Sequence, residues 1–396
     1  MKLEGLRVLD LSLFLPGPLM TQFMADHGAE VIKVESLHEG EPNRSIGAKR
    51  DGVSVYFSNT HRGKKSLALN LKRPEGVEVL MRLAERSDVL IEAFRPGVVD
   101  RLGIGYRQVA ARAPKIIDAS IAAFGQSGPY RDMAAHDLAT EAMTGVLSLN
   151  RGGDGKPAIP ALASADMLAS MMTLSGVLMA LYRRKETGRG DYLDMAMADS
   201  LLACLPNNMG TAMTERRQPV LKEERALGGN ALYNIYETKD GDFIALAGQE
   251  LKFAKNLLEP LGRPDLVKLC ELPPGAGQDP VREFLADAFR RKTKAAWVDW
   301  FSGRDIAFAP LKTLPEVLED PHFKARGMVL QDHNGWDHLG VPIKFADEPG
   351  RPKFEAPAHG RHSSEILRDL GYSEDDIGKL KAGDVIKDAA PGGFLG

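Results

Sequence analysis

A histidine and a carboxylate near the middle of the chain have the chemical types needed to exchange a carbon-bound proton. His136 lies in the run Ala-His-Asp-Leu at 135–138, and Asp166 opens a long apolar segment further along. A base on one face of a carbon acid removes its proton while an acid on the other face returns one. Brought face to face, the two side chains would suffice for a racemase that needs neither a metal nor a redox cofactor.

Both residues also have a plain structural explanation. A histidine at a helix start is often exposed or structural, and an aspartate before an apolar helix can act as its N-cap. Asp137, next to His136, has the helix-start position that favours negative charge. The chemical interpretation therefore depends on the elements that hold these side chains.

Strand and helix patterns alternate through the first two hundred residues, which predicts an α/β domain with a parallel, helix-covered sheet. The segments 136–149 and 167–182 are predicted helices. The latter is shorter than the roughly 20 apolar residues of a membrane span, so we expect a buried core helix. The other predicted strands are 7–11, 30–34, 66–71, 88–92 and 115–123, and the other predicted helices are 18–27 and 74–86.

The pattern changes after residue 200, which predicts further domains. We expect a large domain at 1–200, a charged linker at 201–226 and a small domain at 227–325, with strands at 233–237 and 243–247. The remaining segment, 326–396, is rich in proline and glycine from residue 335 and is expected to return along a surface in extended form.

Composition favours a globular protein without a nucleic-acid or membrane surface. The 396 residues carry a net charge of −3, with 43% hydrophobic and 27% charged residues. The two cysteines form neither a metal-ligand spacing nor a disulfide framework, and the N-terminus lacks the apolar core of a signal peptide. We therefore expect a cytoplasmic protein with no metal site.

Two loops that follow predicted strands have residues suited to an anionic ligand. Pro16 and Gly17 lie in the first strand-to-helix turn, which lacks the G-x-G-x-x-G fingerprint and so disfavours an NAD dehydrogenase. Arg95 and Arg101 follow the strand at 88–92, and ligands in open α/β sheets bind at the carboxyl ends of strands. Because guanidinium groups match phosphate geometry, these arginines are candidate phosphate ligands.

Taken together, the motifs resemble the class III CoA-transferase family (CaiB/BaiF-type), and most closely its α-methylacyl-CoA racemase branch. They are Leu-Pro-Gly-Pro at 15–18, Ala-Glu-Val-Ile-Lys-Val-Glu at 29–35, the run at 62–71, Phe-Arg-Pro-Gly at 94–97, Gly-Gln-Ser-Gly-Pro at 125–129 and Thr-Gly-Arg-Gly at 187–190. The resemblance implies a Rossmann-like CoA-binding domain completed by the C-terminal segment, a smaller inserted α+β domain and an interlocked homodimer.

The resemblance also implies roles for individual residues. In the transferases the aspartate matching Asp166 is a nucleophile, assisted by a glutamine where this chain has Leu15 and covered by a glycine-rich loop that matches 226–229. The racemases have a histidine at the position of His136 and a glutamate at that of Glu250, and this chain has both. Contacts to CoA are implied for Pro16, Gly17, Leu69, Asn70, Lys72, Ala93, Phe94, Arg95, Arg101 and Asp137.

Three functions follow as hypotheses. The favoured one is a racemase or epimerase of 2-methylacyl-CoA thioesters, with His136, Asp166 and an orienting Glu250, and with enolate donors expected among the backbone amides near Asp166. The second is a CoA-transferase that forms an aspartyl-CoA intermediate on Asp166. The third is a CoA-binding protein without catalysis. None requires a cofactor beyond the CoA of the substrate.

Overall fold

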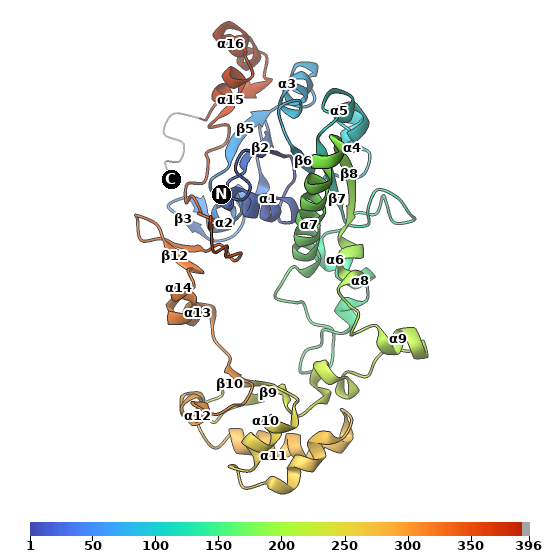
Figure 1. The fold of residues 1–396 in the computed structure, drawn as a ribbon, viewed down its shortest axis with the longest axis vertical. Coiled ribbons are helices and arrows are strands. Elements are labelled where there is room, and N and C mark those ends of the chain that lie inside the picture. The colour runs from blue at the N-terminus through green and yellow to red at the C-terminus, as the bar shows by residue number, and fades with distance from the viewer. Residues whose placement is uncertain (390–396) are drawn as a thin grey trace. The chain divides into compact units, whose positions relative to one another are not determined.

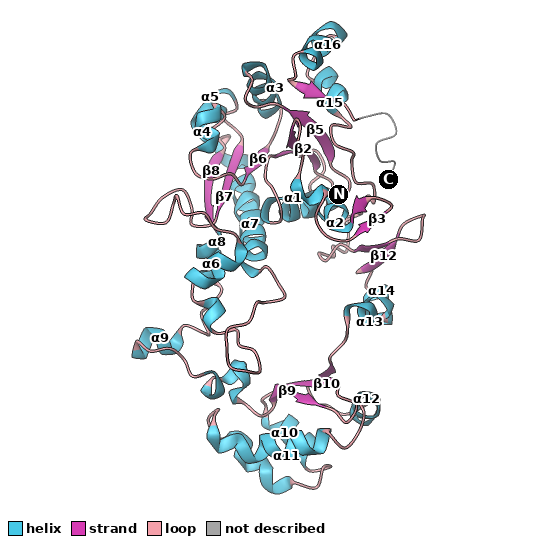
Figure 2. Cartoon of the chain, turned by 180° about the vertical axis from the view of Figure 1, so that it is seen from behind, coloured by secondary structure: helices cyan, strands magenta, loops and turns pink. Residues whose placement is uncertain are grey.

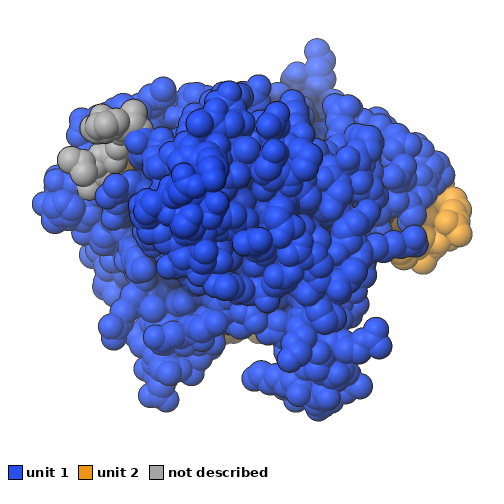
Figure 3. All heavy atoms as spheres, turned by 90° about the horizontal axis from the view of Figure 1, so that it is seen from above, with its two compact units in different colours: residues 1–204, 321–396 blue, residues 205–320 orange. Residues whose placement is uncertain are grey.

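The computed structural model describes residues 1–389, which fall into two compact units. The first unit contains residues 1–204 together with the chain from residue 321, and the second contains residues 205–320 (Figure 3). The segment 201–226, predicted to be a linker, contains regular structure. Its elements include α9 (Gly210–Glu215) and a 3-10 turn at Leu221–Glu223.

The first unit is built on a seven-stranded sheet with the strand order β14-β5-β2-β1-β6-β7-β8 (Figure 1). Every neighbouring pair is parallel except β14 with β5. The strands are β1 (Arg7–Asp10), β2 (Glu30–Ser36), β5 (Lys65–Leu69), β6 (Val89–Glu92), β7 (Ile117–Ala122), β8 (Asp191–Ala196) and β14 (Ile386–Lys387). The α/β class with a mostly parallel sheet, predicted from the sequence, is confirmed.

Helices cover both faces of this sheet, because its inner strands are apolar on both sides. One face packs against α3, α5, α15 and α16, and the other against α1, α7 and α8 (Figure 2). These helices are α1 (Pro16–Asp26), α3 (Pro74–Ala84), α5 (Tyr106–Arg112), α7 (Ser164–Thr187), α8 (Met197–Ala203), α15 (Ser363–Asp369) and α16 (Glu374–Ala382). Both α15 and α16 come from the C-terminal segment, so the two ends of the unit share one core.

The order of the strands creates a switch point between β1 and β6. From β1 the chain moves to β2 and β5 on one side, and then crosses to β6, β7 and β8 on the other. The connections that follow β1 and β6 therefore leave the sheet in opposite directions and open a crevice at the carboxyl ends of these strands. Such crevices are the usual ligand sites of open parallel sheets.

The two helices that carry the candidate residues differ from their predicted lengths. The predicted helix at 136–149 is only α6 (Asp137–Met143) followed by a 3-10 turn at Val146–Ser148, because Gly145 adopts a left-handed conformation between them. In contrast, α7 extends beyond 167–182 at both ends. By length and composition α7 could cross a membrane, but one side of it packs in the core of the first unit.

The second unit has its own core around an antiparallel sheet of order β11-β10-β9. Its strands are β9 (Tyr233–Glu237), β10 (Phe243–Ala247) and β11 (Phe308–Pro310), and its longer helices are α10 (Leu251–Leu258), α11 (Asp279–Phe289) and α12 (Lys294–Phe301). Phe289, Trp297 and Phe301 form the aromatic centre of this core. The strands predicted at 233–237 and 243–247 are confirmed.

Candidate active site

A cavity of about 590 Å³ lies in the crevice at the switch point of the large sheet. Its volume is in the range that accommodates small-molecule ligands. Its walls come from the loops that follow β1, β6 and β7 and from the first turns of α6 and α7. The predicted site residues among its lining are Pro16, Ala93, Phe94, Arg95, His136 and Asp166. The structure thus brings His136 and Asp166 to one cavity.

His136 is the residue immediately before α6, where the backbone is still extended. Its side chain is exposed and meets the edge of the Phe14 ring, with the ring centroids 5.6 Å apart and the planes at 84°. An imidazole at a pocket wall can be reached by a bound ligand and by water. The geometry is therefore compatible with a general base or acid.

Asp166 lies in the first turn of α7 and is partly buried. Burial raises the pKa of Asp166 to about 7, and the nearby carboxylates of Asp137 and Glu141 act in the same direction. Near neutral pH the protonated and ionised forms are both populated. A group in this state can act as the acid in one direction of a reaction and as the base in the other.

The backbone amides at the start of α7 are already engaged. Asp137 Oδ1 accepts hydrogen bonds from Ala165 N at 2.8 Å and from Asp166 N at 3.1 Å, and Glu141 Oε1 accepts one from Ser164 N at 3.3 Å. The prediction that amides near Asp166 stabilise an enolate is therefore wrong for these three. Asp137 thereby joins the start of α7 to α6, and its predicted contact with CoA stays a prediction.

The predicted CoA contacts fall into two groups. Phe94 and the exposed Arg95 follow β6 at the wall of the cavity, and Glu92 Oε2 accepts a 2.7 Å hydrogen bond from Phe94 N. Gly17 lies one residue behind the cavity wall, where a Cβ atom would be 2.0 Å from Ser12 Oγ. The close approach of Ser12 is sufficient to require a glycine here, and the predicted contact of Gly17 with CoA stays a prediction.

The other predicted CoA contacts lie away from the cavity. Arg101 is exposed in α4 (Val98–Leu102), close to the edge of the pocket loop at Gly97. The side chain of Leu69 is buried in the sheet core, and Asn70 Nδ2 donates to Asp384 O at 3.0 Å. Lys72 is exposed in the loop that follows. The roles of these residues in CoA binding stay predictions.

Comparison with known proteins identifies the family. A model of the family described as CoA-transferase family III matches residues 3–363. The chain belongs to CoA-transferase family III. Its fold is that of a solved CaiB/BaiF family protein from Brucella suis, with a TM-score of 0.81 at 29% identity over 93% of this chain and 99% of that one.

Relatives with two different activities are similar to this member of the family. Alpha-methylacyl-CoA racemase of Homo sapiens is 34% identical, with 98% of each chain covered. Succinyl-CoA:glutarate CoA-transferase of Mus musculus is 31% identical, with 97% of this chain and 90% of the relative covered. Identity alone does not separate the two reactions, so the side chains of the site must.

The residues that the family resemblance predicts to distinguish the two branches lie in both units. Leu15, which the resemblance places where transferases have a glutamine, immediately precedes α1 and has no side-chain amide. In the second unit, Glu250 immediately precedes α10 and is exposed. Arg225, immediately before the loop at 226–229, exchanges hydrogen bonds with Gln249. The predicted contact between Glu250 and His136 stays a prediction.

Three side chains of the first unit were missed by sequence reasoning. Tyr56, in α2 (Val55–His61), is close enough to Asp166 to feel its charge, and burial together with that charge raises the pKa of Tyr56 to about 12. Phe14 and Arg131 line the cavity. None lies in a motif of spaced polar residues, so only the folded chain brings them to the site. Among residues 1–389 no cluster of histidine, cysteine or acidic side chains is arranged to hold a metal ion.

Proposed function

We propose that this family III member is an acyl-CoA racemase or epimerase that acts on 2-methylacyl-CoA thioesters. The observation that carries the proposal is the presence of His136 and Asp166 on the walls of one cavity. The raised pKa of Asp166 supports it, because a carboxyl group with a pKa of about 7 can both accept and return a proton at neutral pH.

In the proposed reaction, the thioester carbonyl acidifies the α-carbon of the bound acyl group. Neutral His136 removes the α-proton of one enantiomer, the electron pair passes into a planar enolate, and protonated Asp166 returns a proton to the opposite face. The other enantiomer reacts in reverse, with Asp166 as the base and the imidazolium of His136 as the acid. Glu250 would orient the imidazole and stabilise its charged form.

The CoA part of the substrate would provide much of the binding, through Arg95 at the cavity wall and Arg101 nearby. Each charge-assisted contact to phosphate is worth roughly 1–3 kcal/mol. We expect Arg95→Ala and Arg101→Ala to weaken the calorimetric affinity for free CoA by that amount. Unchanged affinity in both variants would remove these arginines from the CoA site.

A CoA-transferase is the alternative, favoured by the 31% identity to the mouse transferase. Asp166 would attack the donor thioester to give a mixed anhydride and free CoA thiolate. The thiolate would then attack the aspartyl carbonyl, releasing the donor acid and leaving an aspartyl-CoA thioester. This route requires a covalent intermediate on Asp166, whereas racemisation requires none.

We also propose a homodimer, interlocked as the family resemblance implies. The support from the structure is the apolar outer side of α7, where Leu178, Met179 and Tyr182 are exposed. Sedimentation velocity of the full chain checks this, and a folded, active monomer at low concentration would exclude it.

One incubation tests the proposed reaction. The protein is mixed with a single enantiomer of a 2-methylacyl-CoA in D2O, and the product is analysed by mass spectrometry and chiral separation. Racemisation predicts one deuterium at the α-carbon together with loss of optical purity. A parallel incubation with a dicarboxylate acceptor and hydroxylamine identifies a transferase, by acyl transfer and a hydroxamate on Asp166. A protein that binds CoA but gives neither result is a binding protein only.

A further inference from the structure

Phe14 has an unusual backbone conformation beside the candidate active site. Its φ angle is 63°, in the left-handed region that side chains other than glycine rarely adopt. It lies in the loop between β1 and α1, and its side chain is partly exposed at the cavity. Non-glycine residues hold such a conformation only where the surrounding structure enforces it, and they are concentrated at functional sites.

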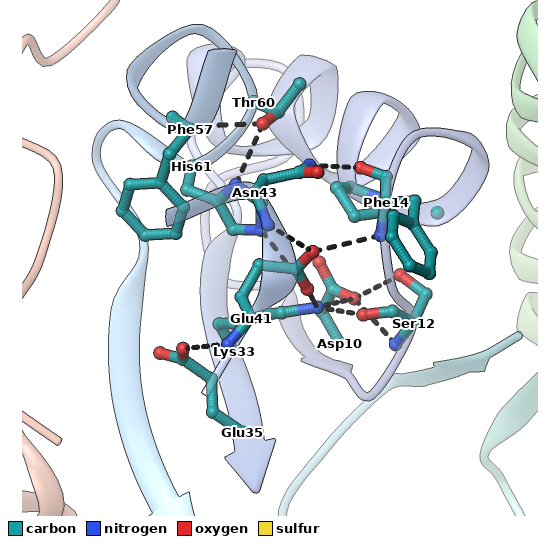
Figure 4. Close-up of polar contacts among 12 residues, drawn as sticks. Asp10, Ser12, Phe14, Lys33, Glu35, Glu41, Asn43, Phe57, Thr60 and His61 are labelled. Atoms are coloured by element: carbon teal, nitrogen blue, oxygen red, sulfur yellow. Dashed lines mark hydrogen bonds and ion pairs between the residues drawn. The ribbon is translucent and has the colours of Figure 1, made fainter. Parts of the chain in front are cut away.

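Two buried side chains form hydrogen bonds with the two polar backbone groups of Phe14, its N–H and its C=O. Glu41 Oε1 accepts a 2.9 Å hydrogen bond from Phe14 N, and Asn43 Nδ2 donates to Phe14 O (Figure 4). We refer to Glu41 and Asn43 as the Phe14 clamp. Because the clamp fixes the N–H and the C=O of the same residue, it determines the direction in which the ring of Phe14 projects.

The Glu41 half of the clamp is held in turn by two residues of β2. Lys33 Nζ lies 3.0 Å from Glu41 Oε2, and Glu35 Oε2 accepts a 2.9 Å hydrogen bond from Glu41 N (Figure 4). Asn43 is completely buried in the 3-10 turn Pro42–Arg44, and its Oδ1 atom has no hydrogen-bond partner. A buried amide that leaves one polar atom unsatisfied is costly, so the contacts that the Asn43 side chain does make, to Phe14 O and to Tyr56, have to explain its presence.

The effect of the clamp reaches His136 through one contact. The Phe14 ring meets His136 in an edge-to-face arrangement at 5.6 Å, a favourable geometry for aromatic pairs. Glu41 and Asn43 do not line the cavity themselves. Both reach the imidazole through the Phe14 ring, and Asn43 also forms a hydrogen bond with Tyr56, whose pKa responds to the charge of Asp166.

We propose that Glu41 and Asn43 are positioning residues, which hold Phe14 in its left-handed conformation so that its ring fixes the orientation of the His136 imidazole. The inference rests on the proposed function, in which His136 exchanges the α-proton of one enantiomer. Neither clamp residue touches the substrate. Their substitution should therefore affect the rate of proton transfer by His136 and leave the affinity for acyl-CoA unchanged.

The test uses Phe14→Ala, Phe14→Gly and Asn43→Leu, the last of which keeps the size of the side chain but removes its donor. For each variant, α-proton exchange in D2O is measured separately from the two enantiomers. We expect exchange from the enantiomer that reacts at His136 to fall roughly ten- to a hundredfold, since small misplacements of a catalytic group have effects of this size. Exchange from the enantiomer that reacts at Asp166 should fall much less in all three variants. KM for both enantiomers should stay within about twofold in Asn43→Leu, which changes no residue of the cavity wall.

Phe345→Ala is a matched control. Phe345 has a similar exposure to Phe14, 40% against 36%, and makes a similar edge-to-face contact with a different histidine, His27, at 5.4 Å and 85°. We expect it to change exchange from neither enantiomer. Thermal melting gives a second control for the backbone: Phe14→Gly should melt above Phe14→Ala, because both lack the ring and only alanine keeps the left-handed strain.

An equal loss of exchange from both enantiomers, in proportion to lost thermal stability, would overturn the inference, as would full exchange in Asn43→Leu. Failure of the proposed function has a different signature, because the wild-type protein would then show no exchange at all. In that case the imidazole nitrogen resonances of His136 decide the inference. We expect them to change in Phe14→Ala and Asn43→Leu but not in Phe345→Ala, and identical resonances in all four proteins would overturn it.

Discussion

Two groups of buried carboxylates in the same sheet differ in their electrostatic surroundings. On the β1 and β2 side, Asp10 lies 3.0 Å from Lys64 Nζ and 3.5 Å from Lys33 Nζ. On the β6 and β7 side, Glu92 and Asp118 are buried and form no ion pair within the described part of the chain. Hydroxyl and amide groups are their neighbours instead, such as Ser120 Oγ and Phe94 N beside Glu92.

The difference sets the protonation of each group. Burial alone would raise the pKa of Asp10, but Lys33 and Lys64 outweigh it and hold that pKa well below its usual range. Burial without a cation raises the pKa of Glu92 to about 8 and that of Asp118 to about 7. Asp166 has the character of the second group. Burial therefore gives a permanent charge where a lysine accompanies the carboxylate, and a proton carrier where none does.

The largest expected effect is a loss of activity without a loss of stability when Asp166, the unpaired carboxylate of the site, is replaced. We expect His136→Ala and Asp166→Asn each to reduce racemisation in both directions by about 10²–10⁴-fold, because every turnover uses both groups. Asp166→Asn should not lower the free energy of unfolding, since it removes a carboxyl group that has no cation partner. Chiral analysis and urea unfolding measure the two quantities. Full racemase activity in His136→Ala would exclude the histidine from the mechanism.

The paired group should respond in the opposite way. Lys33→Met leaves Asp10 and Glu41 with one cation fewer, and breaking a buried pair from one side typically costs about 3–5 kcal/mol of unfolding free energy. Lys65→Met, on the neighbouring strand, is the matched control. Lys65 pairs with Glu30 and Glu365 at 28% side-chain exposure, so it should cost only about 0–1 kcal/mol. Equal losses in the two variants in urea unfolding would contradict the distinction.

Glu92→Gln should change the pH dependence of stability. The folded pKa of Glu92 is raised from 4.5 to about 8, so its neutral form is the one that folding favours. Its contribution to stability is complete below about pH 4.5 and is lost as pH rises through about 8. Glutamine has no proton to lose, and the variant should gain on the order of 1–3 kcal/mol relative to wild type between pH 6 and pH 9. A constant difference across that range, measured by urea unfolding, would show that Glu92 stays ionised.

The smallest effect concerns the neighbour of Asp166. Asp137→Asn keeps an oxygen that can accept the amides of Ala165 and Asp166, but it removes a negative charge that helps to raise the pKa of Asp166. In the direction where Asp166 is the base, the limb of the pH–rate profile near pH 7 should therefore move to lower pH. The matching limb in the direction where Asp166 is the acid should move the same way. Rate profiles for the two enantiomers check this, and an unmoved limb would assign it to another group.

The sequence was sufficient for the elements whose signal is local. The strands at 233–237 and 243–247 and the alternation of strand and helix in the first unit follow from apolar periodicity. The joint placement of His136 and Asp166 at one cavity could be expected only through the resemblance to the family. Periodicity does not specify which strand follows which in the sheet.

The features that were missed depend on contacts between residues far apart in the chain. Asp137 binds amides 28 and 29 positions away, and no local pattern distinguishes this from a cap on its own helix. The left-handed backbone of Phe14 is enforced by side chains 27 and 29 positions away. Sequence propensity predicts glycine for such a backbone, so Phe14 could not be identified before its partners were known.

The strand β14 has a consequence for how the protein is made. It pairs with β5 at the outer edge of the large sheet, so β5 is open until residues 386 and 387 have left the ribosome. The inserted unit is finished by residue 320 and can fold during the interval. An unpaired edge strand is the part of a nascent sheet that is most prone to associate with other chains. The period between synthesis of β5 and of β14 is thus when the newborn chain most needs chaperone protection.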